Sequence, residues 1–133
     1  MIGIVLTGYG KFADGLLDAL ESVTGSTDDI RAVSFEKQDT EESFGRRLQE
    51  AVASFPEGSS ILFLCDMAGG IPYRLAAECA GSMDSEVLAG VNLGMLIESS
   101  ESRAYAKDIH ELAVQIFNIG RDQVEHLSRR SEF

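Results

Sequence analysis

Short apolar runs alternate along the chain with segments in which apolar residues recur every three or four positions. The runs have the length and composition of strands, and they are Met1–Leu6, Ile30–Phe35, Ile61–Cys65 and, more weakly, Val87–Val91. The Ile61–Cys65 run is apolar throughout and too short for a helix, which is typical of a parallel strand covered on both faces. The pattern therefore predicts a sheet of four strands.

Helical spacing separates these runs. The apolar positions that show it are Leu16, Leu17, Leu20 and Val23; Phe44, Leu48, Val52 and Phe55; Tyr73, Leu75, Ala76 and Cys79; and Ile109, Leu112, Ala113, Ile116, Phe117, Val124 and Leu127. Gly25 is a stop signal for the first helix, and Asp39 with Glu42 resembles a capping box at the start of the second. Asp108 is a candidate cap for the last helix, and the polar tail from Ser128 is expected to fray.

Alternating strands and helices predict an α/β fold. We expect one doubly wound domain over residues 1–133, with a mainly parallel sheet, helices on both faces and a fifth strand as an option on dimerisation. In such sheets a ligand site lies beyond the carboxyl ends of the strands, where the strand order reverses.

Two glycine-rich loops follow the first and third strands. They are Thr7-Gly8-Tyr9-Gly10-Lys11 and Asp66-Met67-Ala68-Gly69-Gly70-Ile71-Pro72. If the second and third strands lie on opposite sides of the first, the two loops face each other. Gly69 and Gly70 then permit a close approach to a ligand, and the helix that begins near Pro72 offers its N–H groups to an anion. The same residues also suit an ordinary strand-to-helix connection, with Asp66 as a helix cap.

Composition narrows the classes of partner. Eleven basic and 22 acidic residues give a net charge of −11, which repels nucleic acid and anionic lipid surfaces but permits fast association with a basic protein. The apolar runs are far shorter than the ~20 residues that cross a bilayer, and Met1 begins no signal peptide, so a cytoplasmic protein without membrane insertion is expected. Cys65 and Cys79 lack the spacing of a zinc site and are interpreted as reduced interior thiols. Neither a metal nor a cofactor is expected.

Three segments carry a resemblance to a known family. They are residues 1–25, with a strand and a Thr-Gly-x-Gly start, residues 61–80, with an Asp-x-x-Gly-Gly-x-Pro loop, and residues 86–99, with Ala-Gly-Val-Asn-x-x-Met-Leu. In this order they resemble the enzyme IIA component of the mannose-type sugar phosphotransferase system, including its N-acetylgalactosamine branch. The resemblance implies a cytosolic homodimer. Such a protein takes a phosphoryl group from the histidine-containing phosphocarrier protein onto its own histidine and passes it to an enzyme IIB component for sugar uptake.

The site residues of that family carry over to this chain in part. By resemblance, Asp66 orients the acceptor, and Tyr9 stands where the family has its acceptor histidine. Ile71 stands where the phosphate loop of the family has a Ser or Thr hydroxyl. The phosphate-binding positions that the resemblance implies are Gly8, Gly69, Gly70 and Ile71.

The substitution of the acceptor affects the chemistry directly. A relay residue must be partly deprotonated near neutral pH, as imidazole is with a pKa of ~6.5, whereas tyrosine, with a pKa of ~10, stays mostly protonated. His110 and His126 are predicted about 160° apart around the last helix, so they form no joint site, and each is expected to be solvated. Two interpretations stay open: a phosphocarrier of the family whose transfer is impaired, and a non-catalytic regulatory or binding paralogue.

Two other functions fit parts of the sequence. Gly8-Tyr9-Gly10-Lys11-Phe12-Ala13 fits the dinucleotide fingerprint, and Glu36 follows the second strand where an acid that binds ribose would lie. However, four predicted strands and no substrate domain are too little for a dehydrogenase. A phospho-acceptor receiver domain would use Asp66, but it needs an acidic pair where this chain has Leu6 and Thr7.

The Tyr9 phenol is the donor nearest to Asp66 by loop position. We therefore expect the Tyr9 hydroxyl to donate a hydrogen bond to the Asp66 carboxylate, directly or through water.

Overall fold

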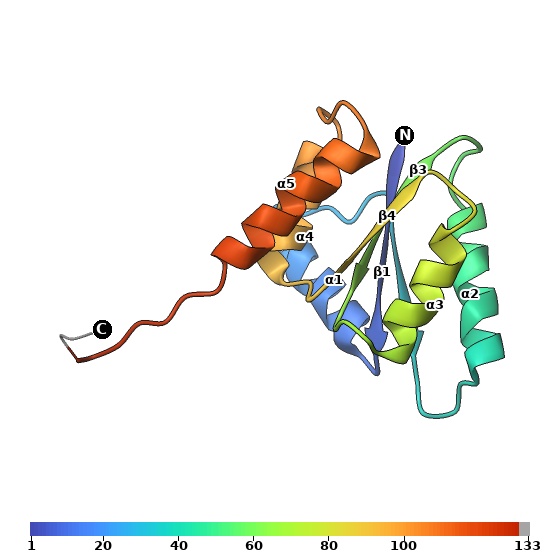
Figure 1. The fold of residues 1–133 in the computed structure, drawn as a ribbon, viewed down its shortest axis with the longest axis horizontal. Coiled ribbons are helices and arrows are strands. Elements are labelled where there is room, and N and C mark those ends of the chain that lie inside the picture. The colour runs from blue at the N-terminus through green and yellow to red at the C-terminus, as the bar shows by residue number, and fades with distance from the viewer. Residues whose placement is uncertain (131–133) are drawn as a thin grey trace.

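A computed structural model describes residues 1–130, which form a parallel sheet of four strands with five helices (Figure 1). The elements in chain order are β1 (Ile2–Tyr9), α1 (Phe12–Thr24), β2 (Ile30–Phe35), α2 (Glu41–Ala53), β3 (Ser60–Cys65), α3 (Ile71–Ala80), β4 (Ser85–Ala89), α4 (Leu93–Ser102) and α5 (Ile109–Asp122). The predicted α/β fold is confirmed.

The strand order is β2-β1-β3-β4, and neighbouring strands are parallel. β2 lies on one side of β1 and β3 lies on the other, so the direction of the strand order reverses at β1. The register pairs Tyr9 with Phe35 in β2 and Thr7 with Cys65 in β3. The two glycine-rich loops therefore emerge at the same edge of the sheet, as predicted.

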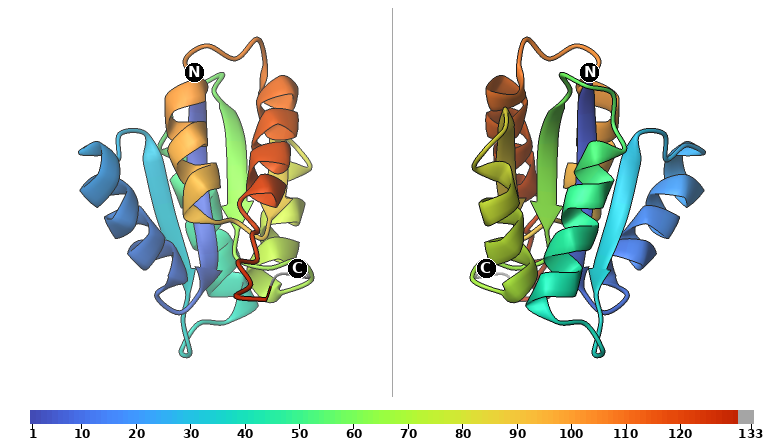
Figure 2. Two further views of the ribbon diagram at one scale, coloured as in Figure 1. Left: turned by 90° about the vertical axis from the view of Figure 1, so that its left-hand side faces the viewer. Right: turned by 90° about the vertical axis from the view of Figure 1, so that its right-hand side faces the viewer.

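Two helical layers cover the sheet, one on each face (Figure 2). Helices α1, α4 and α5 enclose one core, and α2 and α3 enclose the other. Successive residues of a strand point to opposite faces, so β3 supplies both cores: Leu62 and Leu64 enter the first, whereas Ile61 and Phe63 enter the second. This two-sided burial explains why the Ile61–Cys65 run has no polar residue.

Two strands, β1 and β4, differ from the prediction by more than one residue. β1 continues past Leu6 to Tyr9, because its pairing with β2 extends to the Tyr9–Phe35 pair. β4 covers Ser85–Ala89 instead of Val87–Val91, and Gly90 follows it with a left-handed φ of 78°.

The helices also differ in part. α4 has no counterpart in the prediction; its cap is Asn92, whose side chain accepts a hydrogen bond from the N–H of Met95 at 3.0 Å. α5 ends at Asp122 instead of continuing to Leu127. The capping box of α2 is formed by Thr40 and Ser43, not by Asp39 and Glu42.

Asp39 has a different task at that turn. Its carboxylate accepts hydrogen bonds from the N–H of Glu36 at 2.8 Å and from the Arg47 guanidinium at 2.5 Å. The Glu36 N–H and then Arg47 hold the pKa of Asp39 below its usual range. Asp39 therefore fixes the β2–α2 loop instead of starting α2.

The predicted caps of α1 and α5 are confirmed. Gly25 ends α1 with a left-handed φ of 78°, and the Asp108 side chain accepts a hydrogen bond from the N–H of Glu111 at 2.8 Å. The chain after α5 leads away from the sheet (Figure 1). The tail expected to fray from Ser128 is described only as far as Arg130, and its residues 131–133 lie outside the described part.

The two thiols differ in their surroundings. Cys65 is buried, and this burial raises its pKa to about 12. Cys79 is only half-buried, so the expectation of two interior thiols holds for Cys65 alone. Between residues 1 and 130, no helix is long and apolar enough to span a bilayer.

A single arginine joins three segments at the amino end of the sheet. Arg103, at the carboxyl end of α4, donates hydrogen bonds to the carbonyls of Asp29 at 2.9 Å, Ile2 at 3.4 Å and Asp28. Asp29 has a positive φ of 58°, the one such non-glycine residue between residues 1 and 130. The guanidinium thus fastens the start of β1 and the turn before β2 to α4.

Candidate functional site

Asp66, directly after β3, links the two glycine-rich loops. Its Oδ2 accepts a hydrogen bond from the N–H of Tyr9 at 2.9 Å, and its Oδ1 accepts one from the N–H of Met67 at 2.9 Å. Both carboxylate oxygens are thus engaged by main-chain donors. Asp66 neither contacts the Tyr9 phenol nor caps α3, whose N-cap is Gly70.

The Tyr9 hydroxyl makes a different contact from the one predicted. Its oxygen accepts a hydrogen bond from the N–H of Ile71 at 2.9 Å, in the first turn of α3. The predicted direct bond from the hydroxyl to Asp66 is wrong, because Asp66 lies at the Tyr9 main chain while the ring reaches across to α3. Free N–H groups at a helix amino terminus attract anions. Here the hydroxyl oxygen of Tyr9 occupies one of them.

Two glycines make this arrangement possible by close approach. A Cβ atom at Gly8 would lie 2.8 Å from Cγ of Asp66, and one at Gly70 would lie 3.0 Å from Cε2 of Tyr9. Real Cβ atoms essentially never lie closer than 3.0 Å to a non-bonded heavy atom, so a Cβ at Gly8 would not fit, and one at Gly70 would require the Tyr9 ring to shift by a few tenths of an ångström. Gly8 therefore gives space to the carboxylate, and Gly70 gives space to the phenol ring.

The ring of Tyr9 is also held from the side of β2. It meets the Phe35 ring edge to face, with centroids 5.9 Å apart, and Phe35 meets Phe44 in the same way at 5.1 Å. Sequence analysis did not select Phe35, although its place at the end of β2 is the signal that could have found it. Tyr9 still exposes 40% of its surface, and Met67 beside it exposes 53%.

Five of the predicted site residues are linked by contacts, and they are Tyr9, Gly8, Asp66, Gly70 and Ile71. Gly69 directly precedes Gly70 in the same loop; a Cβ there would meet nothing within 4 Å, and its left-handed φ of 80° serves the turn.

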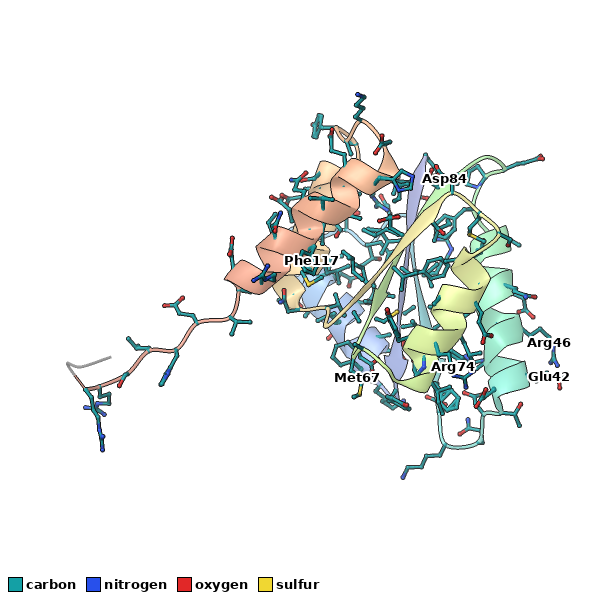
Figure 3. All side chains as sticks on the ribbon, viewed as in Figure 1. Glu42, Arg46, Met67, Arg74, Asp84 and Phe117 are labelled. Atoms are coloured by element: carbon teal, nitrogen blue, oxygen red, sulfur yellow. The ribbon has the colours of Figure 1, made fainter. Side chains whose placement is uncertain are left out.

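The two histidines are elsewhere; both are exposed, as predicted, but only His110 lies in the last helix. His110 is exposed in the first turn of α5 but pairs with Glu86 at 3.0 Å and with Asp84 at 3.5 Å. His126 follows α5 and is not part of it. Figure 3 shows Asp84 at the opposite end of the sheet from Met67 and Arg74. His110 therefore cannot serve the site around Tyr9.

Chemically, one donor of the site is unavailable to an anion while the Tyr9 hydroxyl stays bonded to it. The α3 N–H that faces Tyr9 is already bonded, and Ile71 contributes an apolar side chain. Among residues 1–130, no group of three or more His, Cys, Asp or Glu residues is placed to hold a metal ion. Thr7, one of the positions where a receiver domain needs an acid, donates its hydroxyl to the Val33 carbonyl at 2.5 Å.

Comparison with known proteins gives a consistent result. Residues 3–123 match the family described as PTS system fructose IIA component. The chain is 26% identical to the PTS system fructose-specific EIIA component of Bacillus subtilis strain 168, over 99% of this chain and 95% of that protein. It is 28% identical to the PTS system mannose-specific EIIAB component of Escherichia coli K12, over 97% of this chain and 40% of that protein.

A solved structure shows the same fold. The crystal structure of phosphotransferase system component EIIA from Streptococcus agalactiae superimposes with a TM-score of 0.87 at 26% identity, covering 95% of this chain and 97% of that one.

Proposed function

This chain belongs to the mannose-type enzyme IIA family of the sugar phosphotransferase system, whose family role is that of a phosphocarrier, and on that premise we propose that it no longer relays phosphoryl groups. In this proposal Tyr9 occupies the acceptor position and Asp66 the position of the orienting carboxylate. The phosphate-binding positions are Gly8, Gly69, Gly70 and Ile71. The protein keeps the fold and the partner-facing surface of a carrier and acts as a non-catalytic regulatory or binding member.

The observation that carries the proposal is the polarity of the Tyr9 hydrogen bond. Its oxygen accepts from the Ile71 N–H, so a lone pair that a nucleophile would need is directed at a donor. Within residues 1–130 the hydroxyl donates to no acceptor, and both oxygens of Asp66 are already bonded to main-chain N–H groups. A nucleophile of this kind is activated by an adjacent general base or a lowered pKa. The phenol has no such base beside it.

Release of the phosphoryl group from Tyr9 would also be slow. A carrier must release the phosphoryl group to the next protein, and a phenolic phosphate ester is far less reactive than a phosphorylated imidazole. Ile71 also lacks the hydroxyl that would donate to a phosphate oxygen. Loss of one such donor typically costs on the order of 10²-fold in rate. Acceptance and release are thus both impaired.

The surface around the site supports continued binding of a partner. Tyr9, Phe12 and Met67 are large apolar side chains that expose 40%, 39% and 53% of their surfaces at the carboxyl end of the sheet. The net charge of −11 favours a basic partner. We propose that the histidine-containing phosphocarrier protein and an enzyme IIB component, in the cytoplasm, are the partners to test.

We also propose that the protein is a homodimer. Strands β2 and β4 are the two edges of the sheet within residues 1–130. Edge strands present unpaired N–H and C=O groups that natural proteins cover or blunt. Light scattering at micromolar concentration is expected to give the mass of two chains, whereas the mass of one chain would contradict the dimer.

Restoring the acceptor tests the proposed loss of relay activity. The wild type, Tyr9→His and Tyr9→His with Ile71→Thr are incubated with phosphoenolpyruvate, enzyme I and the phosphocarrier protein, and the acid-labile label on each is measured. Tyr105→His is the matched control, because Tyr105 is 90% exposed and lies in the loop before α5. Circular dichroism confirms that each variant is folded.

We expect label on Tyr9→His and not on Tyr105→His. The added Ile71→Thr change should raise the rate of labelling, by up to about 10²-fold if the hydroxyl supplies an oxyanion-type donor. A folded Tyr9→His variant that accepts no label would contradict the view that this substitution is what silences the site.

A further inference from the structure

A small cavity opens where β1 and β2 end. It has a volume of about 280 Å³ and is lined by Tyr9, Gly10, Phe35, Glu36 and Lys37. This is the region that the glycine motif between Gly8 and Ala13 leads into, and the phosphocarrier proposal makes no use of it. Ligands of open α/β sheets bind beyond the carboxyl ends of the strands, which is where the cavity lies.

Its aromatic walls are held in place before any ligand arrives. Tyr9 is fixed at its main chain by Asp66 and at its hydroxyl by the Ile71 N–H, both at 2.9 Å. The Phe35 carbonyl accepts from the N–H of Gly10 at 2.9 Å, and its ring is packed between Tyr9 and Phe44. A site whose walls are already fixed avoids the entropy cost of ordering them on binding.

Glu36 supplies an oriented carboxylate to the rim, which Lys37 also lines. Glu36 directly follows β2, and its N–H donates to Asp39 at 2.8 Å. Its Oε2 accepts from the side-chain amide of Gln38 at 3.1 Å, and its Oε1 lies 4.0 Å from Nζ of Lys11. A carboxylate has about four acceptor positions, so Glu36 can still accept from a ligand that presents two hydroxyl groups.

We propose that this cavity binds a neutral nucleoside, with its base against the rings of Tyr9 and Phe35 and its ribose hydroxyls donating to Glu36. An acid at the end of the second strand is suited to a ribose diol. The volume lies just under the ~300 Å³ at which pockets for drug-sized ligands begin, which is the scale of one nucleoside. The net charge of −11 disfavours a polyphosphate further.

Titration with adenosine tests the proposal, and it does so independently of the phosphocarrier assays. Amide shifts of the full chain are recorded by NMR with adenosine, ribose, adenine and NAD⁺. Adenosine is expected to shift Gly10, Glu36 and Lys37 saturably, with a dissociation constant on the order of 0.1 mM for a ligand of this size. Ribose alone and adenine alone should each bind at least about tenfold more weakly than adenosine, because each makes half of the contacts.

Two variants and a control separate this site from unspecific binding. Glu36→Gln should lower the affinity for adenosine about tenfold, because hydrogen bonds to an ionised acceptor are roughly twice as strong as those to a neutral one. Phe35→Leu removes one aromatic wall and should lower the affinity for adenosine by a similar factor. Glu57 is an exposed acid in the turn before β3, and Glu57→Gln should leave the affinity unchanged. Tyr9→Phe keeps the ring but loses its bond to the Ile71 N–H, so it should bind adenosine more weakly than the wild type and more tightly than Phe35→Leu.

The protein has no Trp and three Tyr residues, so a second readout is available. Stacking on Tyr9 should quench tyrosine fluorescence in the wild type and change it less in Tyr9→Phe. The proposal is overturned by the absence of saturable shifts up to the solubility limit of adenosine. It is equally overturned by shifts that Glu36→Gln does not weaken, or by NAD⁺ binding more tightly than adenosine.

Discussion

Asp66 with Tyr9 at one end of the sheet and Arg103 at the other make opposite kinds of polar contact with the main chain. At the carboxyl end, acceptor oxygens of Asp66 and Tyr9 bind main-chain N–H groups of residues 9, 67 and 71. At the amino end, the Arg103 guanidinium donates to main-chain carbonyls of residues 2, 28 and 29. The first set is largely exposed, whereas Arg103 is half-buried.

The fold itself explains this division. In a parallel sheet with crossover helices, amino termini of helices gather at the carboxyl ends of the strands, where they favour negative or acceptor groups. Carboxyl termini of helices gather at the other end and favour cations, and Arg103 is the C-cap of α4. We infer that the Arg103 contacts at the amino end serve stability, while the exposed contacts of Asp66 and Tyr9 at the carboxyl end stay available for binding.

Removal of Arg103 should have the largest effect on stability. Arg103→Ala deletes three charge-assisted hydrogen bonds to carbonyls, and we expect the free energy of unfolding to fall by about 2–3 kcal/mol. Urea unfolding followed by circular dichroism measures this. The control is Arg46→Ala, which removes an exposed pair with Glu42 at 3.2 Å and should cost no more than about 0.5 kcal/mol. Equal losses of unfolding free energy in Arg103→Ala and Arg46→Ala would contradict the proposed role of Arg103 in stability.

Loss of the Tyr9 hydroxyl should have a smaller effect on stability and a clear local one. Tyr9→Phe deletes the bond to the Ile71 N–H at an exposed site, so we expect a loss of about 0.5–1 kcal/mol. Hydrogen exchange of the Ile71 amide should accelerate, with little change at the amides of β3. Tyr105→Phe is the matched control. An Ile71 amide that exchanges equally fast in Tyr9→Phe and wild type would show that the phenol does not protect it.

The smallest effect concerns His110 at the amino end. Its hydrogen bond with Glu86, and then the charges of Glu86, Asp84 and Asp108, raise its pKa above the ordinary value of ~6.5. A raised pKa stabilises the fold at pH below that ordinary value, and this contribution is lost as the pH rises through the higher folded value. The melting temperature should therefore fall slightly more between about pH 6 and pH 8 in the wild type than in His110→Gln. Identical pH profiles would contradict the pairing.

The sequence predicted the sheet better than it predicted the contacts of the site. The Ile61–Cys65 run and the helical spacing around Phe44 and Leu48 are strong signals, because burial on both faces of a sheet leaves no position for polar residues. Helix α4 was missed, since Gly94 interrupts its apolar spacing, although Asn92 is a cap signal that could have revealed it. The meeting of the two glycine loops followed from strand order alone.

The partner of the Tyr9 hydroxyl could not be predicted in the same way. A sequence shows which side chains can donate, but every residue other than proline also carries a main-chain N–H. Both groups that were expected to bind each other, the Tyr9 phenol and the Asp66 carboxylate, bind main-chain donors instead. Which main-chain donor lies within reach depends on the path of the loops, and Gly8 and Gly70 set that path by close approach.

The most direct test of the proposed loss of phosphoryl relay at Tyr9 uses the unmodified protein. It is incubated with phosphoenolpyruvate, enzyme I, the phosphocarrier protein and then an enzyme IIB component, and the phosphoryl group is located on each protein by intact-mass and peptide mass spectrometry. We predict that the wild type carries no phosphoryl group and passes none to the enzyme IIB component. A phosphoryl group found on Tyr9 and then on the enzyme IIB component would contradict the account, because it would show that a phenol bonded to the Ile71 N–H can act as a relay.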